Sequence, residues 1–136
     1  MTRIKEIIKE LELLPHPEGG YYKETYRSAG NINPESLNDN YNGKRSYSTC
    51  IYFLLTSDDF SAFHKIEQDE IWHFHEGSPI KLHTISENGI HKEHLIGNDF
   101  SSGQKPQLVV DGNHWFAASI TEQNSYALVS CTVSPG

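Results

Sequence analysis

The spacing of apolar side chains along the chain changes after about residue 20. Within residues 3–14, Ile4, Ile7, Ile8 and Leu11 recur at the spacing of an amphipathic helix, and we expect a helix over this range. The Pro and Gly residues that follow cannot continue it, because proline lacks a backbone N–H and glycine favours turns. The pattern therefore predicts one short helix near the N-terminus.

Short runs of β-branched and aromatic residues dominate from residue 45 onward, separated by turn residues such as Asn88-Gly89, a pair that suits a tight hairpin. The expected strands are 46–55, 62–66, 70–75, 80–85, 90–96, 107–110, 115–120 and 126–133. Residues 21–27 are a further candidate strand, and residues 28–44, rich in Asn, Gly, Ser and Asp, are expected to form a long loop. Short strands without intervening helices predict an all-β sandwich, barrel or jelly roll.

Length, charge and cysteines narrow the class of protein. A chain of 136 residues has the usual size of one domain, so we expect a single domain over residues 1–136. Its net charge of −7 and its pI near 5.5 make nucleic acid and anionic membranes unexpected partners. The charged N-terminus lacks the apolar run of a signal peptide, and we expect a cytoplasmic protein. Cys50 and Cys131 are expected to be free, buried thiols.

Histidine, with 8 copies, is the most prominent candidate for chemistry. Alternate side chains of a strand share a face, so Glu70, Trp72 and Phe74 are expected on one face, with His73 and His75 on the other. Two imidazoles at positions i and i+2 can provide half of a zinc or copper site, but no Cys or third His stands nearby in the sequence. Surface histidines are the simpler interpretation of the pair.

One segment resembles the first motif of the cupin superfamily, in which two His and one Glu are metal ligands. In that motif the Glu is followed after six residues by Gly, as Glu70 is by Gly77. His64 stands at the place of the first His, while Ile66 replaces the second. Two of this motif's three metal ligands are therefore retained.

The second cupin motif, Pro-x-Gly-x-x-His-x-x-x-Asn, is matched in part by residues 110–119. Gly112 is kept, Trp115 stands where the metal-binding His would be, and His114 is one place out of register. The resemblance implies a metal held by three His and one Glu, which this chain cannot supply. We expect no metal and no other cofactor in the barrel.

A closer resemblance, to the cupin_5 branch of the superfamily, a domain of unknown function, extends over nearly the whole chain. It is carried by residues 14–22 (LPHPEGGYY), by His64 with 69–73 (DEIWH), and by 133–136 (VSPG). The resemblance implies an all-β double-stranded β-helix, the cupin jelly roll, over about residues 45–133. It also implies a homodimer and a shape similar to that of sugar-nucleotide epimerases. Members of the branch continue past this Pro-Gly, so a final strand is expected to be missing here.

The cupin resemblance and the strand alternation together predict a ligand pocket inside the barrel. His64 and Glu70 are the expected catalytic pair, because a carboxylate can orient a histidine that exchanges a proton near neutrality. Trp72, Phe74 and Trp115 are the expected ligand-binding residues, since an aromatic face suits a ring-bearing organic ligand. The plainer alternatives are that Trp115 only fills the core and that His64 and Glu70 form an internal hydrogen bond.

Three functions therefore remain open. The first is an isomerase or epimerase acting on a carbohydrate or a nucleotide-sugar, which the retained His64 and Glu70 favour. The second is a non-catalytic module that binds a small molecule, which the lack of a recognisable phosphate-binding Arg cluster favours. The third is a metal-dependent cupin using His73, His75 or His114. The fold alone does not decide among them.

Overall fold

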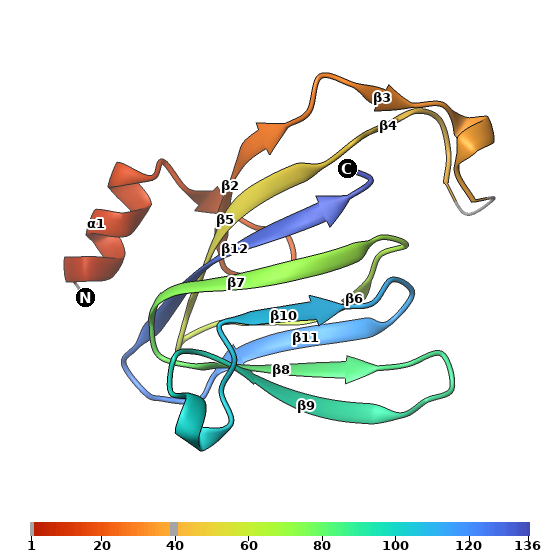
Figure 1. Cartoon of the computed structure of the whole chain (residues 1–136). Coiled ribbons are helices and arrows are strands. Elements are labelled where there is room, and N and C mark those ends of the chain that lie inside the picture. The colour runs from red at the N-terminus through yellow and green to blue at the C-terminus, as the bar shows by residue number, and fades with distance from the viewer. Residues whose placement is uncertain (1, 39–40) are drawn as a thin grey trace.

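The computed structural model describes residues 2–38 and 41–136, and its longer strands form two antiparallel sheets that face each other (Figure 1). The strands are β1 (Leu14–Pro15), β2 (Tyr21–Arg27), β3 (Asn31–Ile32), β4 (Arg45–Ser46), β5 (Thr49–Thr56), β6 (Phe60–Lys65), β7 (Asp69–Gly77), β8 (Ile80–Ile85), β9 (His91–Ile96), β10 (Gln107–Val110), β11 (Trp115–Ile120) and β12 (Tyr126–Ser134). One sheet has the order β1-β2-β5-β12-β7-β10 and the other β6-β11-β8-β9. The expected all-β jelly roll is confirmed.

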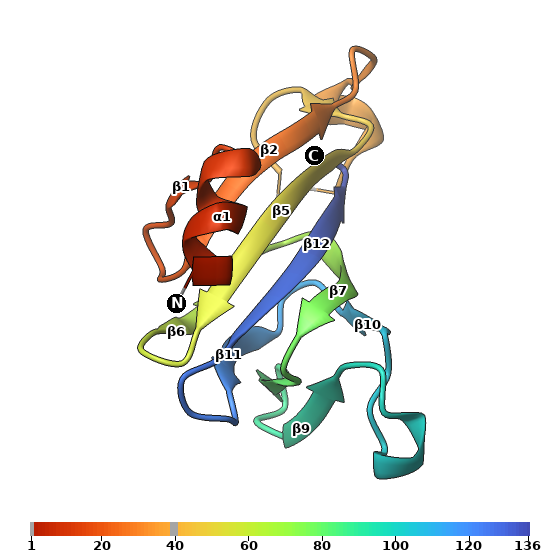
Figure 2. The same ribbon diagram turned by 90° about the vertical axis from the view of Figure 1, so that its left-hand side faces the viewer.

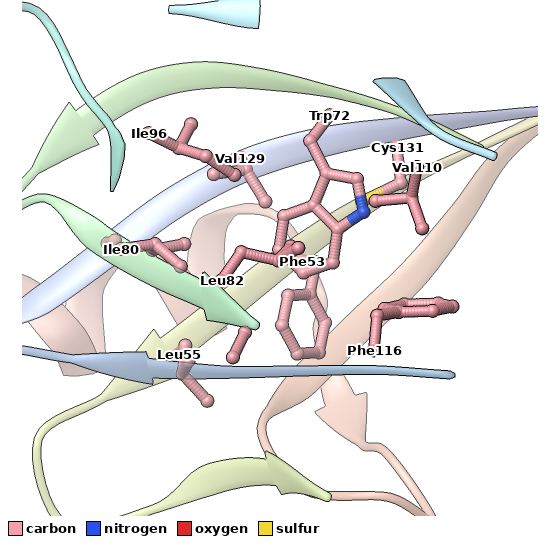
Figure 3. Close-up of a cluster of buried hydrophobic side chains, with 12 residues drawn as sticks. Phe53, Leu55, Trp72, Ile80, Leu82, Ile96, Val110, Phe116, Val129 and Cys131 are labelled. Carbon is pink, nitrogen blue, oxygen red and sulfur yellow. The ribbon is translucent and has the colours of Figure 1, made fainter. Parts of the chain in front are cut away.

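The hydrophobic core lies between the two sheets (Figure 3). Alternation places every second side chain of a strand inside, so Val129 and Cys131 of β12 meet Leu82 of β8 and Phe116 of β11 across the interior. Trp72 of β7 stands near the centre of this cluster and is 2% exposed. Burial of these side chains from both sheets holds the two layers together.

Helix α1 (Thr2–Glu10) packs on the outer face of the larger sheet, across β2 and β5 (Figure 2). Its Ile7 joins a second apolar cluster with Leu54 of β5 and Leu128 of β12. The helix is nine residues long and, among the described residues, no helix is long and apolar enough to cross a membrane.

An ion pair fastens α1 to strand β7. Arg3 donates to both carboxylate oxygens of Glu76, at 2.8 and 2.7 Å, and Tyr126 donates to the same carboxylate at 2.6 Å. These hydrogen bonds, that from Arg3 above all, lower the pKa of Glu76 to about 2. The helix is thus held by a charged contact as well as by its apolar face.

The structure differs from the expected elements at three places. The helix ends at Glu10 rather than at residue 14, because the chain turns through Glu12, whose φ is +56°, into β1. The barrel begins before residue 45, since β2 pairs with β5 as a full member of the larger sheet. The expected loop 28–44 contains β3, which pairs with β4, and a 3-10 turn at Pro34–Ser36, while residues 39 and 40 lie outside the described residues.

Candidate functional site

A cavity between the two sheets brings together residues that are far apart in the chain. Its outer part has a volume of about 330 Å3, and a smaller hollow of about 30 Å3 continues it toward the core. Both parts are lined by His16, Ile51, His64, Glu70 and Cys131. Ionisable side chains and apolar walls therefore share one space, which is typical of a ligand-binding site.

His64 reaches this cavity from β6, where it lies opposite Phe116 of β11, and the two ring centroids are 4.2 Å apart. Its Nδ1 lies 2.8 Å from the backbone carbonyl oxygen of Ala62. A carbonyl oxygen can only accept a hydrogen bond, so Nδ1 carries the proton. In the neutral ring the other nitrogen, Nε2, therefore has a free lone pair and can act as a base.

His16 borders the same cavity in the opposite tautomer. The backbone N–H of Glu18 donates to its Nδ1 at 3.0 Å, so this nitrogen is an acceptor and Nε2 carries the proton. Burial lowers the pKa of His16 and favours the neutral ring, and nearby His64 acts in the same direction. The carboxylate of Glu18, 3.2 Å from Nδ1, opposes this shift without overcoming it. His16 thus presents an N–H donor where His64 presents a lone pair.

Glu70 of β7 adds a carboxyl group with altered acidity. Burial raises its pKa, although Cys131 and His64 each act to lower it. Burial likewise raises the pKa of the Cys131 thiol, with a further contribution from Glu70. The protonated carboxyl is favoured more than in water and can donate a hydrogen bond.

Trp72 offers one more donor next to Glu70. Its indole ring lines the inner hollow, and its Nε1–H has no acceptor within the described part of the chain although the atom is buried (Figure 3). A buried N–H without a partner is costly, and a polar ligand atom in the hollow would relieve that cost. The cavity therefore contains hydrogen-bond donors that a ligand rich in acceptor atoms would satisfy.

The segment that carries His16 is attached to the barrel by hydrogen bonds that its own backbone atoms make. Ala62 N–H donates to the carbonyl of Glu18 at 2.9 Å, and Gly20 N–H donates to the Asp59 carboxylate at 2.9 Å. Gly19 has a φ of +111°, and a Cβ placed there would lie 2.0 Å from the carbonyl oxygen of Phe60. The Gly-Gly pair is thus required for this close approach, which brings His16 to the cavity.

Of the predicted site residues, His64, Glu70 and Trp72 line the cavity and the other two do not. Phe74 is partly buried and packs against the core cluster on the same strand face as Trp72, but it does not line the cavity. The prediction that Trp115 faces the interior is wrong. Its side chain is 46% exposed and lies on the outer face, beneath the ammonium of Lys65.

Strand alternation explains the position of Trp115. Because His64 points inward, its cross-strand partner Phe116 also points inward, and Phe116 is 1% exposed. The neighbouring Trp115 must then point outward. Phe116, Trp72 and Phe53 form the aromatic wall of the inner hollow in its place.

His16 and Glu18 are site residues that the sequence reasoning missed. Both stand in the segment LPHPEGGYY, which carried the family resemblance without an assigned role. The histidine between two prolines and ahead of Gly-Gly was the available signal. Strand periodicity could not place it, because the segment lies outside the regular strands.

The residues of the barrel interior do not fit the metal that many cupins hold. Ile66 occupies one ligand position, and on β11 the residue that faces inward is Phe116 rather than the exposed Trp115. Neither Ile66 nor Phe116 has a donor suited to a metal. Among the described residues, the one group of three or more potential ligands whose donor atoms lie within 4.8 Å of one another is His83, His91 and Glu93, outside this cavity. The cavity chemistry is therefore that of its acids, bases and hydrogen-bond donors.

The other candidate metal ligands are dispersed and have hydrogen-bond partners. His73 and His75 of β7 contact the hydroxyl groups of Thr132 and Ser130 on the adjacent strand. His114 contacts the carbonyl of Gly112. No three of these groups converge within the described residues. Cys50 and Cys131 are both free, as expected, although Cys50 is only partly buried.

Comparisons with known proteins agree on the family. Residues 5–136 match the model of the cupin superfamily family DUF985. An uncharacterized protein from Saccharomyces cerevisiae is 30% identical over 144 residues, which cover 99% of this chain and 71% of that protein. The structure is similar to a hypothetical protein from Leishmania major, with a TM-score of 0.87 and 37% identity over 97% of this chain and 81% of that one.

A protein from Shewanella oneidensis is similar at a TM-score of 0.86 and 35% identity, over 97% of this chain and 77% of that one. More distant likeness, at a TM-score of 0.58 and 11% identity, extends to oxalate decarboxylase from Bacillus subtilis, over 89% of this chain and 26% of that one. That last match concerns the fold alone. The chain belongs to the DUF985 (cupin_5) family of the cupin superfamily.

Proposed function

We propose that the protein is a metal-independent isomerase or epimerase that acts on a small carbonyl compound, most simply an uncharged carbohydrate. The observation that carries the proposal is the pair of opposite tautomers on one cavity. His64 presents a base, while His16 presents an N–H donor, and backbone atoms hold both states. Enolisation needs such a pair, because a proton leaves carbon while negative charge develops on the carbonyl oxygen.

The proposed reaction needs no oxidant or reductant. His64 Nε2 takes the proton from the carbon beside the carbonyl, and the electron pair of the C–H bond forms a C=C bond. The carbonyl π electrons move to oxygen, where the N–H groups of His16 and Trp72 or the protonated Glu70 stabilise the charge. Return of a proton to the other face of the same carbon, while the negative charge on oxygen re-forms the C=O bond, gives the epimer. Return of the proton to the former carbonyl carbon gives the isomer, with transfer of the neighbouring hydroxyl proton to the former carbonyl oxygen and formation of the new C=O bond at the neighbouring carbon.

The lining supports an uncharged substrate rather than a nucleotide-sugar. The described residues that line the cavity include the carboxylate of Glu18 but neither Lys nor Arg. A diphosphate would meet like charge there without a cation to neutralise it. The volume of about 330 Å3 is at the lower end of ligand pockets, which suits a monosaccharide, and the aromatic wall suits a ring.

Hydrogen exchange at carbon tests the proposal without knowledge of the product. The wild-type protein is incubated in D2O with each member of a panel of aldoses and ketoses, and proton NMR follows the loss of the C–H signal beside the carbonyl. We expect catalysed exchange for at least one sugar. His64→Gln should reduce it by about 10²–10⁴-fold, the usual contribution of a general base.

A matched control separates this effect from altered folding. His75→Gln changes a histidine on the outer side of β7, away from the cavity, and should leave exchange unchanged. His16→Gln should slow exchange while leaving the base in place. If a sugar binds to the wild-type protein but no exchange is catalysed, the proposal fails and a non-catalytic binding module is the remaining interpretation.

A further inference from the structure

We propose that the β8–β9 hairpin carries a binding site for a divalent transition-metal ion, for which zinc is the probe, formed by His83, His91 and Glu93. The site lies on the outer side of the smaller sheet and shares no residue with the cavity between the sheets. The donor set is two imidazoles and one carboxylate, a combination that zinc accepts readily while keeping a position open for water. Nothing in the proposed isomerase chemistry uses these residues.

Strand register brings the three side chains to one face. His83 of β8 is directly opposite Glu93 of β9, and His91 precedes Glu93 by two residues on the same strand. Opposite residues and residues two apart share a sheet face, so all three project to the same side. The turn that joins the two strands is short and is closed by a hydrogen bond of 2.9 Å from the Gly89 N–H to the Ser86 carbonyl oxygen. The three side chains therefore project from a hydrogen-bonded hairpin.

The distances between donor atoms fit a metal ion. His83 Nδ1 lies 2.9 Å from His91 Nε2 and 3.9 Å from Glu93 Oε1, and one donor atom from each residue lies within 4.8 Å of the other two. Ligands about 2.0–2.1 Å from a tetrahedral zinc ion stand about 3.3 Å apart. The observed separations lie on either side of that value, so small ring and carboxylate rotations suffice to bring the three donors onto one ion.

The simpler interpretation of the two histidines is a hydrogen bond between their rings, which are stacked with centroids 5.2 Å apart. That contact satisfies one donor and one acceptor but does not involve the Glu93 carboxylate, whose Oε1 lies 3.9 Å from His83 Nδ1. Lys81 is the only cation near the group among the described salt-bridge partners, with its Nζ 3.9 Å from Glu93 Oε2. Lys81 competes with a bound ion for the carboxylate, which makes it a useful site for a test.

Zinc titration followed by isothermal calorimetry tests the site, with Co2+ absorption as an independent report on coordination. The wild-type protein should bind one Zn2+ at this hairpin, and Co2+ should give the visible bands of a low-coordinate nitrogen and oxygen site. His91→Gln and Glu93→Gln should each weaken binding by about 10-fold or more, since even loss of an outer partner of a metal ligand costs 10–100-fold. Lys81→Met should strengthen binding.

Control variants make the outcome decisive. His75→Gln and His64→Gln leave the hairpin intact and should not change zinc affinity, which also separates this site from the proposed base. Thermal unfolding and circular dichroism establish that each variant is folded. Unchanged zinc affinity in His91→Gln, or binding lost in His64→Gln instead, would overturn the proposal whatever the result of the exchange experiment.

Discussion

Trp115 and Phe116 are neighbours in the chain but differ completely in burial, and the difference decides which of them can shape the cavity. Phe116 is 1% exposed and contacts His64, whereas Trp115 is 46% exposed and contacts Lys65 from outside. The sequence alone favoured Trp115, because it occupies a motif position that normally points inward. Only the pairing of β11 with β6 shows that the inward register belongs to the next residue.

Alanine substitutions at these two positions should therefore have unequal costs. Phe116→Ala removes a ring from a packed core and should lower the free energy of unfolding by roughly 3–5 kcal/mol. Trp115→Ala should cost about 1 kcal/mol or less, since half of its surface is already in water. Urea unfolding followed by circular dichroism measures both. Equal costs would show that Trp115 is a core residue after all.

At the level of elements, hydrophobic periodicity predicted the strands well but not their partners. The strands 80–85, 107–110 and 115–120 have the expected bounds, because each alternates clearly between turn residues. The sheet order β1-β2-β5-β12-β7-β10 joins segments distant in sequence, which local pattern does not encode. His64 and Glu70 were predictable as site residues because one local motif contains both, although their strands β6 and β7 belong to different sheets. His16 was not predictable, because it lies outside that motif.

The segment between β1 and β2 is the element on which the second histidine depends. Gly19→Ala should destabilise the protein and displace His16, because its Cβ would lie 2.0 Å from a backbone oxygen that cannot move freely. Gly103→Ala is the matched control, since its φ of +83° is also positive but nothing lies within 4 Å of a Cβ there. The control should cost about 1–2 kcal/mol for the backbone strain alone.

Thermal unfolding compares the two glycine variants, and the sugar exchange assay compares their activity. Gly19→Ala should lose more stability than Gly103→Ala and should also lose exchange. If the two variants behave alike, the close approach of this segment to β6 contributes nothing beyond the backbone conformation of Gly19.

For the whole molecule, the family resemblance predicts a homodimer, and the exposed edge of the larger sheet is a place where one could form. Val109 lies on the short edge strand β10 and is 52% exposed. Multi-angle light scattering at 0.15 M salt, where repulsion from the net charge of −7 is screened, should give twice the 15.4 kDa of one chain. Val109→Glu should weaken association through that edge. A wild-type mass of one chain at micromolar concentration would refute the prediction.

The hydrogen bond from His64 to the carbonyl of Ala62 has a consequence for how such a protein can evolve. The acceptor that orients the proposed base belongs to the backbone of its own strand, so no single side-chain replacement can delete it. Ile51, on another wall, takes no part in that hydrogen bond, so its replacement leaves the acceptor of His64 in place. Substrate preference can therefore change between lineages while the proton-transfer step is preserved. The orientation of the proposed base, His64 Nε2, is in this sense robust to mutation.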